Sequence, residues 1–314
     1  MGKTVTPMNR WTSKKERGSP WTIRFMIWLC QHRNRWLADL LLYPIVAYFL
    51  LTAGSTRQAS RHFFQLAKGS FSWDDHYQQL MCFARSLIDR VSILMGESRH
   101  FEVKHHGRND LIEMRRKGQG LILLGAHLGN FEACKILVKN QANINVHIVA
   151  YFASSKKIRS GLDAINPDLI NNVIDPTSPD AVFQMRDVLE NGGILAILGD
   201  RTGIGEKKLP VEFLGEPTFL PAGPYFLAAI LGCPVFCFLG LRVDERTYET
   251  HAIKLADHIQ LRRGHRLEEA QPYAQKYADF LGEKARQHPH NWFNFFEFWD
   301  TSATPDSNTK SLRP

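Results

Sequence analysis

The sequence predicts an α/β domain with a mostly parallel sheet flanked by helices, preceded by an N-terminal membrane-anchoring helix. Short apolar runs alternate with segments of helical character from about residue 121 onward, which is the order that a parallel sheet requires. Charge is uneven: residues 1–70 carry eleven Lys or Arg against two acids, a net charge of +9, and the remaining chain carries −1. An apolar run, residues 37–53, lies inside this basic segment.

The apolar run reads LADLLLYPIVAYFLLTA and has the shortest length that spans a bilayer. Asp39 and Pro44 within it favour an in-plane helix or a hairpin over a single span. Aromatic residues and cationic flanks are typical of a membrane interface. The alternative, a helix buried in a soluble core, explains the apolar run but not the basic flanks. We expect a basic disordered N-terminus over 1–20, a membrane anchor over 21–60, the main domain over 61–300 and a disordered tail over 301–314.

The main domain is predicted to alternate strands with helices. Strands are expected at residues 121–125, 146–152, 194–198 and 234–243, and helices at residues 130–139, 179–190, 221–231 and 266–286. Ser178 is a suitable N-cap for the second of these helices, and the glycines at 192 and 193 end it.

The first candidate site follows the strand at 121–125. A glycine-rich turn contains His127, and Glu132 falls five residues later in the first turn of a predicted helix. A carboxylate that reaches one imidazole nitrogen fixes the tautomer and leaves the other nitrogen to accept a proton from an alcohol. No serine or cysteine in a G-x-S-x-G setting accompanies the pair, so direct attack by an acceptor hydroxyl on an activated acyl group is the simplest chemistry. The alternative is a capped helix with a structural histidine.

Two further segments carry candidate substrate-binding residues. Asp200 and Arg201 follow the strand at 194–198, so we expect them at the same sheet edge as His127, unless they form only a local salt bridge. The aromatic segment at 291–299 either lines an acyl-chain pocket or belongs to the core. The candidate substrate-binding residues are Asp200, Arg201, Asn130, Phe131, Trp292 and Phe293.

Neither metal nor nucleic acid is expected as a partner. His105 and His106, and likewise His288 and His290, have no companion ligands at metal spacing, and H-E-x-x-H is absent, so these histidines are interpreted as surface residues. The basic N-terminal segment contains no nucleic-acid recognition motif.

Taken together, these motifs give a chain that resembles the lipid A late acyltransferase superfamily, the lauroyl and myristoyl transferases of lipopolysaccharide synthesis. The shared features are the entry at 37–53, the H-x4-D/E motif of His127 and Glu132, Gly-Asp-Arg at 199–201, the stretch at 213–221, and Asn-Trp-Phe at 291–293. They cover about residues 20–300 in family order. Only the H-x4-D/E motif is specific to the family. The other features support the resemblance because they occur in the same order along the chain as in the family.

The resemblance implies an acyltransferase domain of the glycerolphosphate-acyltransferase type on the cytoplasmic face of a bacterial inner membrane. It implies an acyl-carrier-protein thioester as donor, a lipid or glycolipid hydroxyl as acceptor, and no metal or other cofactor. The basic residues of segment 1–70 themselves predict contact with anionic inner-membrane lipids. His127 would be the general base, Glu132 its partner and Asp200 a further site residue. Residues 149–155 lack the arginine that lipid A enzymes carry in this region. Lipid A enzymes also tend to have a neutral or acidic residue after the Asp of the second strand, whereas here Asp200 is followed by Arg201. These departures are more similar to members that acylate other lipids, such as those of aryl-polyene pathways.

Two alternatives remain open at this point. A coenzyme-A-dependent glycerolipid acyltransferase would have the same chemistry, although those enzymes usually carry H-x4-D where this chain has Glu132. A non-catalytic membrane lipid-binding or assembly protein would keep the basic anchor and the aromatic segment but would not need His127 and Glu132.

Overall fold

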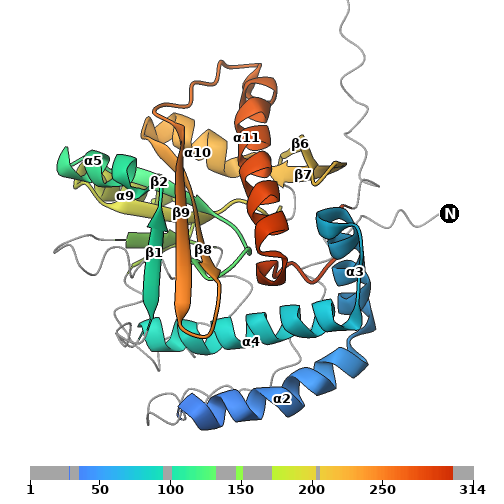
Figure 1. The fold of residues 1–314 in the computed structure, drawn as a ribbon. Coiled ribbons are helices and arrows are strands. Elements are labelled where there is room, and N and C mark those ends of the chain that lie inside the picture. Colours follow the sequence, from blue (N-terminus) through green and yellow to red (C-terminus); the bar gives the residue numbers. More distant parts are fainter. Residues whose placement is uncertain are drawn as a thin grey trace, which may run out of the picture.

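A seven-stranded sheet forms the centre of the computed structural model, which describes residue 28 and residues 35–94, 101–131, 146–150, 172–202 and 206–299. Its strands are β1 (Glu102–His106), β2 (Leu121–Gly125), β3 (Val146–Val149), β4 (Val173–Ile174), β5 (Ile194–Leu198), β8 (Val235–Arg242) and β9 (Thr247–Ala256). Their order is β1-β9-β8-β2-β5-β3-β4, and every neighbouring pair is parallel except β8 and β9 (Figure 1). The predicted α/β class with a mostly parallel sheet is confirmed.

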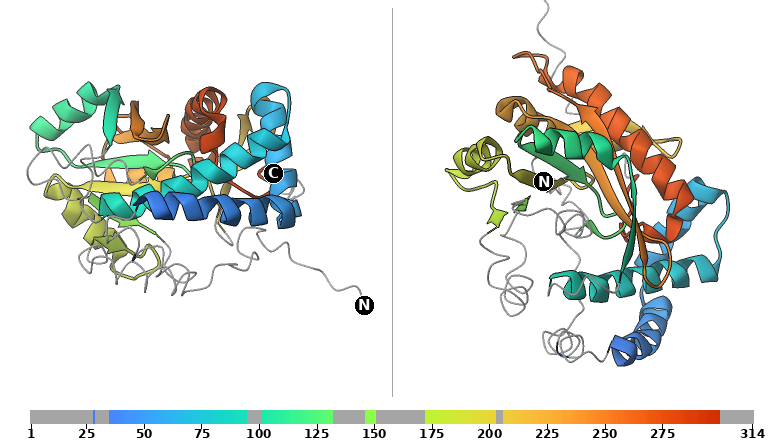
Figure 2. Two further views of the ribbon diagram at one scale, coloured as in Figure 1. Left: turned by 60° about the horizontal axis from the view of Figure 1, so that its bottom comes forward. Right: turned by 60° about the vertical axis from the view of Figure 1, so that its left-hand side comes forward.

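Helices cover both faces of this sheet and one of its ends. They are α2 (Arg35–Thr52), α3 (Gly54–Lys68), α4 (Trp73–Leu94), α5 (Arg108–Arg116), α9 (Ala181–Glu190), α10 (Gly223–Leu231), α11 (Arg266–Gln287) and the short 3₁₀ helix η4 (Pro289–Asn291). A small antiparallel sheet of β6 (Lys208–Phe213) and β7 (Glu216–Pro221) packs against α11. Helix α4 runs across the end of the large sheet, with α2 alongside it (Figures 1 and 2).

The core follows the alternation of side chains along the strands. In β2, Ile122 and Leu124 face a cluster that includes residues of α9, α10 and α11, whereas Leu121 and Leu123 face the opposite cluster with Leu111 of α5. All four β2 residues are completely or almost completely buried. Burial on both faces explains why central parallel strands appear as uninterrupted apolar runs. The strands predicted over 121–125 and 194–198 from such apolar runs are found as β2 and β5 with the same bounds.

Other predicted elements differ at their ends or are new. The helix predicted from residue 221 begins at Gly223 because Pro221 is the last residue of β7 and pairs with Lys208. The strand predicted over 146–152 is β3 up to Val149, and its last two residues lie outside the described residues, as does most of the helix predicted over 130–139. The structure adds β1, β4, the β6–β7 pair and β9, together with α3, α4 and α5.

The N-terminal part begins with α2, whose two faces differ. Ala38, Leu42 and Val46 are buried against α4. The exposed large side chains are Trp36, Leu40, Tyr43, Tyr48 and Leu51. Taken singly, no helix among the described residues has the length and apolar content needed to cross a bilayer, but residues 36–52 and 54–68, bent by 88°, meet both criteria as a pair. The predicted segments 1–20 and 301–314 lie outside the described residues.

Candidate active site

The pairing of β2 with β5 brings two predicted site residues together. These parallel strands align Gly125 with Leu198, and the Gly199 N–H donates a hydrogen bond of 2.9 Å to the Gly125 carbonyl oxygen. His127 and Asp200 each come two residues after these aligned strand ends. Both side chains therefore lie at the carboxyl edge of the sheet, where open α/β folds place their ligands.

His127 and Asp200 are joined by two hydrogen bonds. Nδ1 of His127 lies 2.9 Å from Oδ1 of Asp200, and the backbone N–H of His127 donates to Oδ2 over 3.0 Å. The Asp200 side chain is completely buried, whereas the imidazole is 28% exposed. In the neutral ring, Nδ1 carries the proton that Asp200 accepts, so Nε2 presents a lone pair. Within the described part of the chain, no residue forms a hydrogen bond with Nε2.

Asp200 is ionised despite its burial. Burial alone would raise the pKa of this carboxyl group, but the charge and hydrogen bond of His127, the charge of Arg201 and the amide of Asn294 outweigh it. The pKa of Asp200 is consequently well below its usual value. A fixed negative charge at this point holds the imidazole in one tautomer and stabilises the imidazolium once a proton has been accepted.

A second layer of hydrogen bonds holds Asp200 itself. The Asn294 amide donates to Oδ2 of Asp200 over 2.7 Å, and its carbonyl oxygen accepts a bond of 2.8 Å from Nε of Arg201. The guanidinium group of Arg201 lies over the ring of Phe296, 5.5 Å from its centroid. Because Arg201 occupies the amide oxygen, the amide nitrogen of Asn294 must face Asp200.

The turn that carries His127 is fixed by its backbone. The Gly129 N–H donates to the Asn291 carbonyl oxygen, and the His127 carbonyl oxygen accepts from the Phe293 N–H, each over 2.8 Å. Gly129 has φ +81°, and a Cβ there would lie 2.3 Å from the Gly240 carbonyl oxygen. Only glycine fits this backbone conformation and this close approach. The segment after η4 and strand β8 thus hold the turn from two sides.

The remaining predicted residues surround this centre. Glu132 lies outside the described residues. Asn130 is buried, and Phe131 packs edge-on against Phe238, with ring centroids 5.9 Å apart. Trp292 is buried between the rings of Phe63 and Phe213, and Phe293 packs edge-on against Phe83. In this structure Trp292 and Phe293 pack into the core beside the site, and a role of the aromatic segment in lining an acyl-chain pocket stays a prediction.

The sequence analysis did not identify three residues that support the site. Asn294 holds Asp200, the Tyr277 hydroxyl donates to the Gly125 carbonyl oxygen over 2.7 Å, and the Gln79 amide donates to the Trp292 carbonyl oxygen. The sequence does contain a signal for Asn294, because a polar amide stands there between two phenylalanines of the aromatic segment. Tyr277 had none, since a buried tyrosine on α11 matches the apolar face of that helix.

The match to a protein family covers this whole site. A family model described as bacterial lipid A biosynthesis acyltransferase matches residues 78–301. The matched range begins in α4 and includes every strand, His127, Asp200 and the segment after η4. A comparison with curated proteins gave no match.

Proposed function

Because the chain belongs to the bacterial lipid A biosynthesis acyltransferase family, we propose that it moves a fatty acyl chain from an acyl-carrier-protein thioester to a hydroxyl of a lipid or glycolipid. Family membership makes it an acyltransferase that acts on a lipid. The observation that carries the finer proposal is the bond between Nδ1 of His127 and the buried, ionised Asp200. It leaves Nε2 as a base at the sheet edge.

The chemistry follows from this arrangement. Nε2 of His127 takes the proton of the acceptor hydroxyl while the hydroxyl oxygen attacks the thioester carbonyl carbon. As the tetrahedral intermediate collapses, the carbon–sulfur bond breaks, and the leaving thiolate takes the proton back from the imidazolium. The products are the acylated lipid and the free carrier thiol, with His127 neutral again. General-base help of this kind is worth about 10²–10⁴ in rate.

Two carboxylates are candidates for orienting His127, and we assign this role to Asp200. Its contact with Nδ1 is 2.9 Å, and Asn294 holds it on the other side. Glu132 stays a predicted partner on the strength of the H-x4-E spacing. Arg201 supports Asn294 in this scheme, and acceptor binding by Arg201 stays a prediction that can be tested separately.

We further propose that α2 lies in the plane of the inner membrane, with the catalytic domain on the cytoplasmic face. Trp36, Tyr43, Tyr48 and other large side chains are exposed on α2, while its opposite face packs on α4. A helix with one protein-facing and one exposed aromatic face suits the interface better than a span. The charge of +9 over residues 1–70 attracts anionic lipids. Cysteine labelling that placed residues 10 and 290 on opposite sides of the membrane would contradict this topology.

The acyl-transfer proposal is tested by mass spectrometry of a membrane lipid extract incubated with the protein and either acyl-carrier-protein or coenzyme-A thioesters. We expect a product from the carrier-protein donor, and its mass identifies the acceptor as a lipid A precursor or another lipid. His127→Ala should reduce the rate by at least about 10²-fold. His258→Ala, at an exposed histidine outside the site, is the matched control and should retain the wild-type rate.

Other outcomes separate the alternatives. Transfer from coenzyme A alone would identify a glycerolipid-type donor preference. If folded, membrane-bound protein transferred no acyl chain from either donor, or if His127→Ala matched wild type, the proposed mechanism would be wrong. A lipid-binding or assembly role would then be the better explanation.

A further inference from the structure

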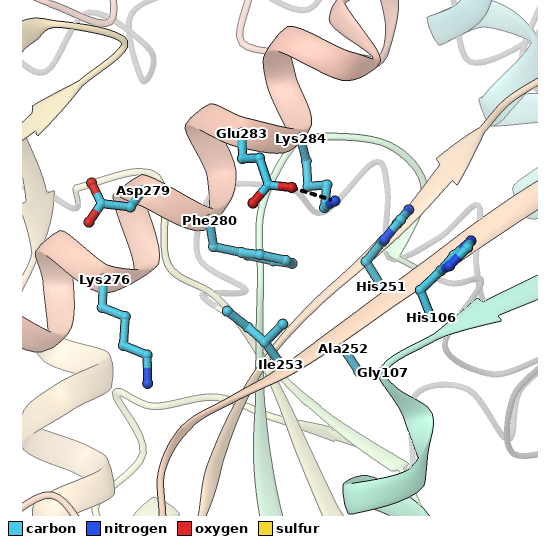
Figure 3. Close-up of a pocket in the computed structure, with 10 residues that line it drawn as sticks. All are labelled: His106, Gly107, His251, Ala252, Ile253, Lys276, Asp279, Phe280, Glu283 and Lys284. Carbon is cyan, nitrogen blue, oxygen red and sulfur yellow. Dashed lines mark hydrogen bonds and ion pairs between the residues drawn. The ribbon is translucent and has the colours of Figure 1, made fainter.

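A second group of histidines lies beside a pocket on the α11 side of the sheet, apart from the His127 site. The pocket has a volume of about 420 Å³ and lies between β9, the end of β1 and α11 (Figure 3). His106, His251, Phe280 and Lys284 are among its lining residues, and none of the residues that hold His127 contributes to it.

Strand pairing brings the histidines of this group together. In the parallel β1–β9 pair His106 is aligned with His251, and the two side chains point the same way with their rings stacked, centroids 4.6 Å apart (Figure 3). Glu249 is two residues before His251, so it projects from the same face of β9. Its Oε2 atom lies 3.6 Å from Nε2 of His106 and 3.5 Å from Nε2 of His251. Nε2 of His288, directly after α11, is 4.0 Å from the same oxygen.

We call His106, Glu249, His251 and His288 the histidine cluster. His251 is its least accessible member. Its side chain is 9% exposed, and its buried Nε2 has no hydrogen-bond partner within the described part of the chain. Burial, helped by the charge of Lys284, lowers the pKa of His251 to about 4 even though Glu249 opposes the shift. The buried Nε2 of His251 faces Oε2 of Glu249 at 3.5 Å and is available as a ligand atom.

We propose that His106, Glu249 and His251, with His288 as fourth ligand, bind a divalent transition-metal ion of the zinc class. Neutral imidazoles and a carboxylate are common zinc ligands, and bond lengths of about 2.0–2.2 Å place tetrahedral ligand atoms roughly 3.3–3.6 Å apart. The separations of 3.5 and 3.6 Å from Glu249 agree with this geometry. The ligand atoms of His106, Glu249 and His251 all lie within 4.8 Å of one another.

Two local adjustments complete the site. The interplanar angle of 8° between His106 and His251 must open, because one ion cannot lie in the planes of two stacked rings. The His106 side chain is 52% exposed and has room to turn. His288 must also move closer, because its Nε2 lies 4.0 Å from Oε2 of Glu249 and His288 is outside the group of three whose ligand atoms lie within 4.8 Å of one another. Lys284 lies at the rim, and its ammonium group is held by Glu283 and Gln287, each at 2.9 Å.

The position of His288 gives the ion a structural consequence. His288 directly precedes η4, and the Asn291 carbonyl oxygen at the end of η4 accepts the bond from Gly129 in the turn of His127. A bound ion would tie β1 and β9 to the start of this segment. The sequence analysis interpreted His106 and His288 as surface histidines without companion ligands. Their companions come from β9, which no local spacing could reveal.

Cobalt binding tests the proposal without depending on acyl transfer. Full-length protein without a polyhistidine tag, purified in detergent and stripped with EDTA, is titrated with Co²⁺. We expect one equivalent to bind with the visible absorption of a four-coordinate Co²⁺ site, and one equivalent of Zn²⁺ to displace it. His106→Ala and Glu249→Gln should each weaken Co²⁺ binding at least about tenfold, since even indirect ligand support is worth that much.

The controls make a negative result decisive. His106 is half exposed and Glu249→Gln preserves size, so both variants should melt as wild type does in EDTA. His258→Ala, at an exposed histidine outside the cluster, should bind Co²⁺ as wild type does. The proposal is overturned if wild type binds no Co²⁺, if both folded cluster variants bind as wild type does, or if His258→Ala weakens binding as much as they do.

Discussion

Two histidine–carboxylate groups in this chain use the same residue types in different ways. In the active site one completely buried carboxylate, Asp200, serves one imidazole and also accepts bonds from backbone and amide N–H groups. In the histidine cluster Glu249, 22% exposed, faces three imidazoles at 3.5–4.0 Å. A carboxylate whose oxygens are saturated by donors orients a base. One that faces several imidazole nitrogens suits a cation.

The largest effect is expected at the carboxylate of the active site. Asp200→Asn removes the charge that stabilises the imidazolium and the acceptor that fixes the His127 tautomer, so kcat should fall by about 10²–10⁴. Co²⁺ binding at the histidine cluster should be unchanged. Steady-state acyl transfer and cobalt titration on the same preparation measure both, and Asp110→Asn, at an exposed residue of α5, is the control.

Glu132→Gln completes this experiment. If Asp200 orients His127, then Glu132→Gln must cost less in kcat than Asp200→Asn. The reverse order, with Asp200→Asn close to wild type, would return the orienting role to Glu132 and reduce Asp200 to a structural residue.

A second comparison substitutes one glycine beside each of the two groups. Gly129 lies two residues after His127, and Gly107 directly follows His106. Both have positive φ, and a Cβ at either would lie within 2.3 Å of a carbonyl oxygen on a neighbouring strand. Alanine at either position should lower the free energy of unfolding by more than about 1–3 kcal/mol, because backbone strain alone has that cost and the clash of the Cβ with the carbonyl oxygen adds to it. Gly129→Ala should reduce acyl transfer at least about tenfold and leave Co²⁺ binding intact, and Gly107→Ala should do the opposite.

Gly264→Ala is the matched control for this pair. Gly264 also has positive φ, but a Cβ there meets nothing within 4 Å, so only the backbone strain remains. Thermal melting should show a smaller loss than for the other two variants. Equal losses of acyl transfer in the Gly129 and Gly107 variants would mean that the two groups are not independent.

The sequence predicted more of the active site than of the histidine cluster for a physical reason. Apolar runs locate β2 and β5, and the end of a parallel strand is a known position for ligands, so His127 and Asp200 were expected at one sheet edge. The order of strands is not visible in the sequence, so nothing placed β5 next to β2. Proximity along the chain favoured Glu132 as the partner of His127. The contact with Asp200 depends on that strand pairing.

The histidine cluster could not be predicted from spacing at all. It depends on β9, which runs antiparallel to β8 and whose sequence TYETHAIKLA neither forms an apolar run nor alternates regularly between polar and apolar residues, so it gave no clear strand signal. Asn294 is an intermediate case. Its neighbours were identified as an aromatic segment, but its bond to Asp200 requires the chain to return from α11 to the site.

A smaller effect is expected where support for Asp200 is removed and its charge is kept. Asn294→Ala deletes one charge-assisted hydrogen bond, so kcat should fall roughly tenfold. If Arg201 acts only through Asn294, then Arg201→Gln should cost little more in the Asn294→Ala background. If instead the double variant loses activity by the product of the two single losses, and its KM for the lipid rises, then Arg201 binds the acceptor. Asn191→Ala, at an exposed helix end, is the control.

The smallest effect concerns the charge at the rim of the histidine cluster. Lys284 lowers the pKa of His251 through its positive charge, and the same charge repels a bound cation. Lys284→Gln should therefore strengthen Co²⁺ binding by roughly threefold at low ionic strength, and added salt should reduce the gain through screening. Lys276→Gln is the matched control because its ammonium group is held by the backbone carbonyls of Lys254 and Leu255 and points away from His251 in Figure 3. Weaker Co²⁺ binding in Lys284→Gln would indicate that the ion lies elsewhere in the pocket. Acyl transfer should be unaffected in both variants if the two groups act independently.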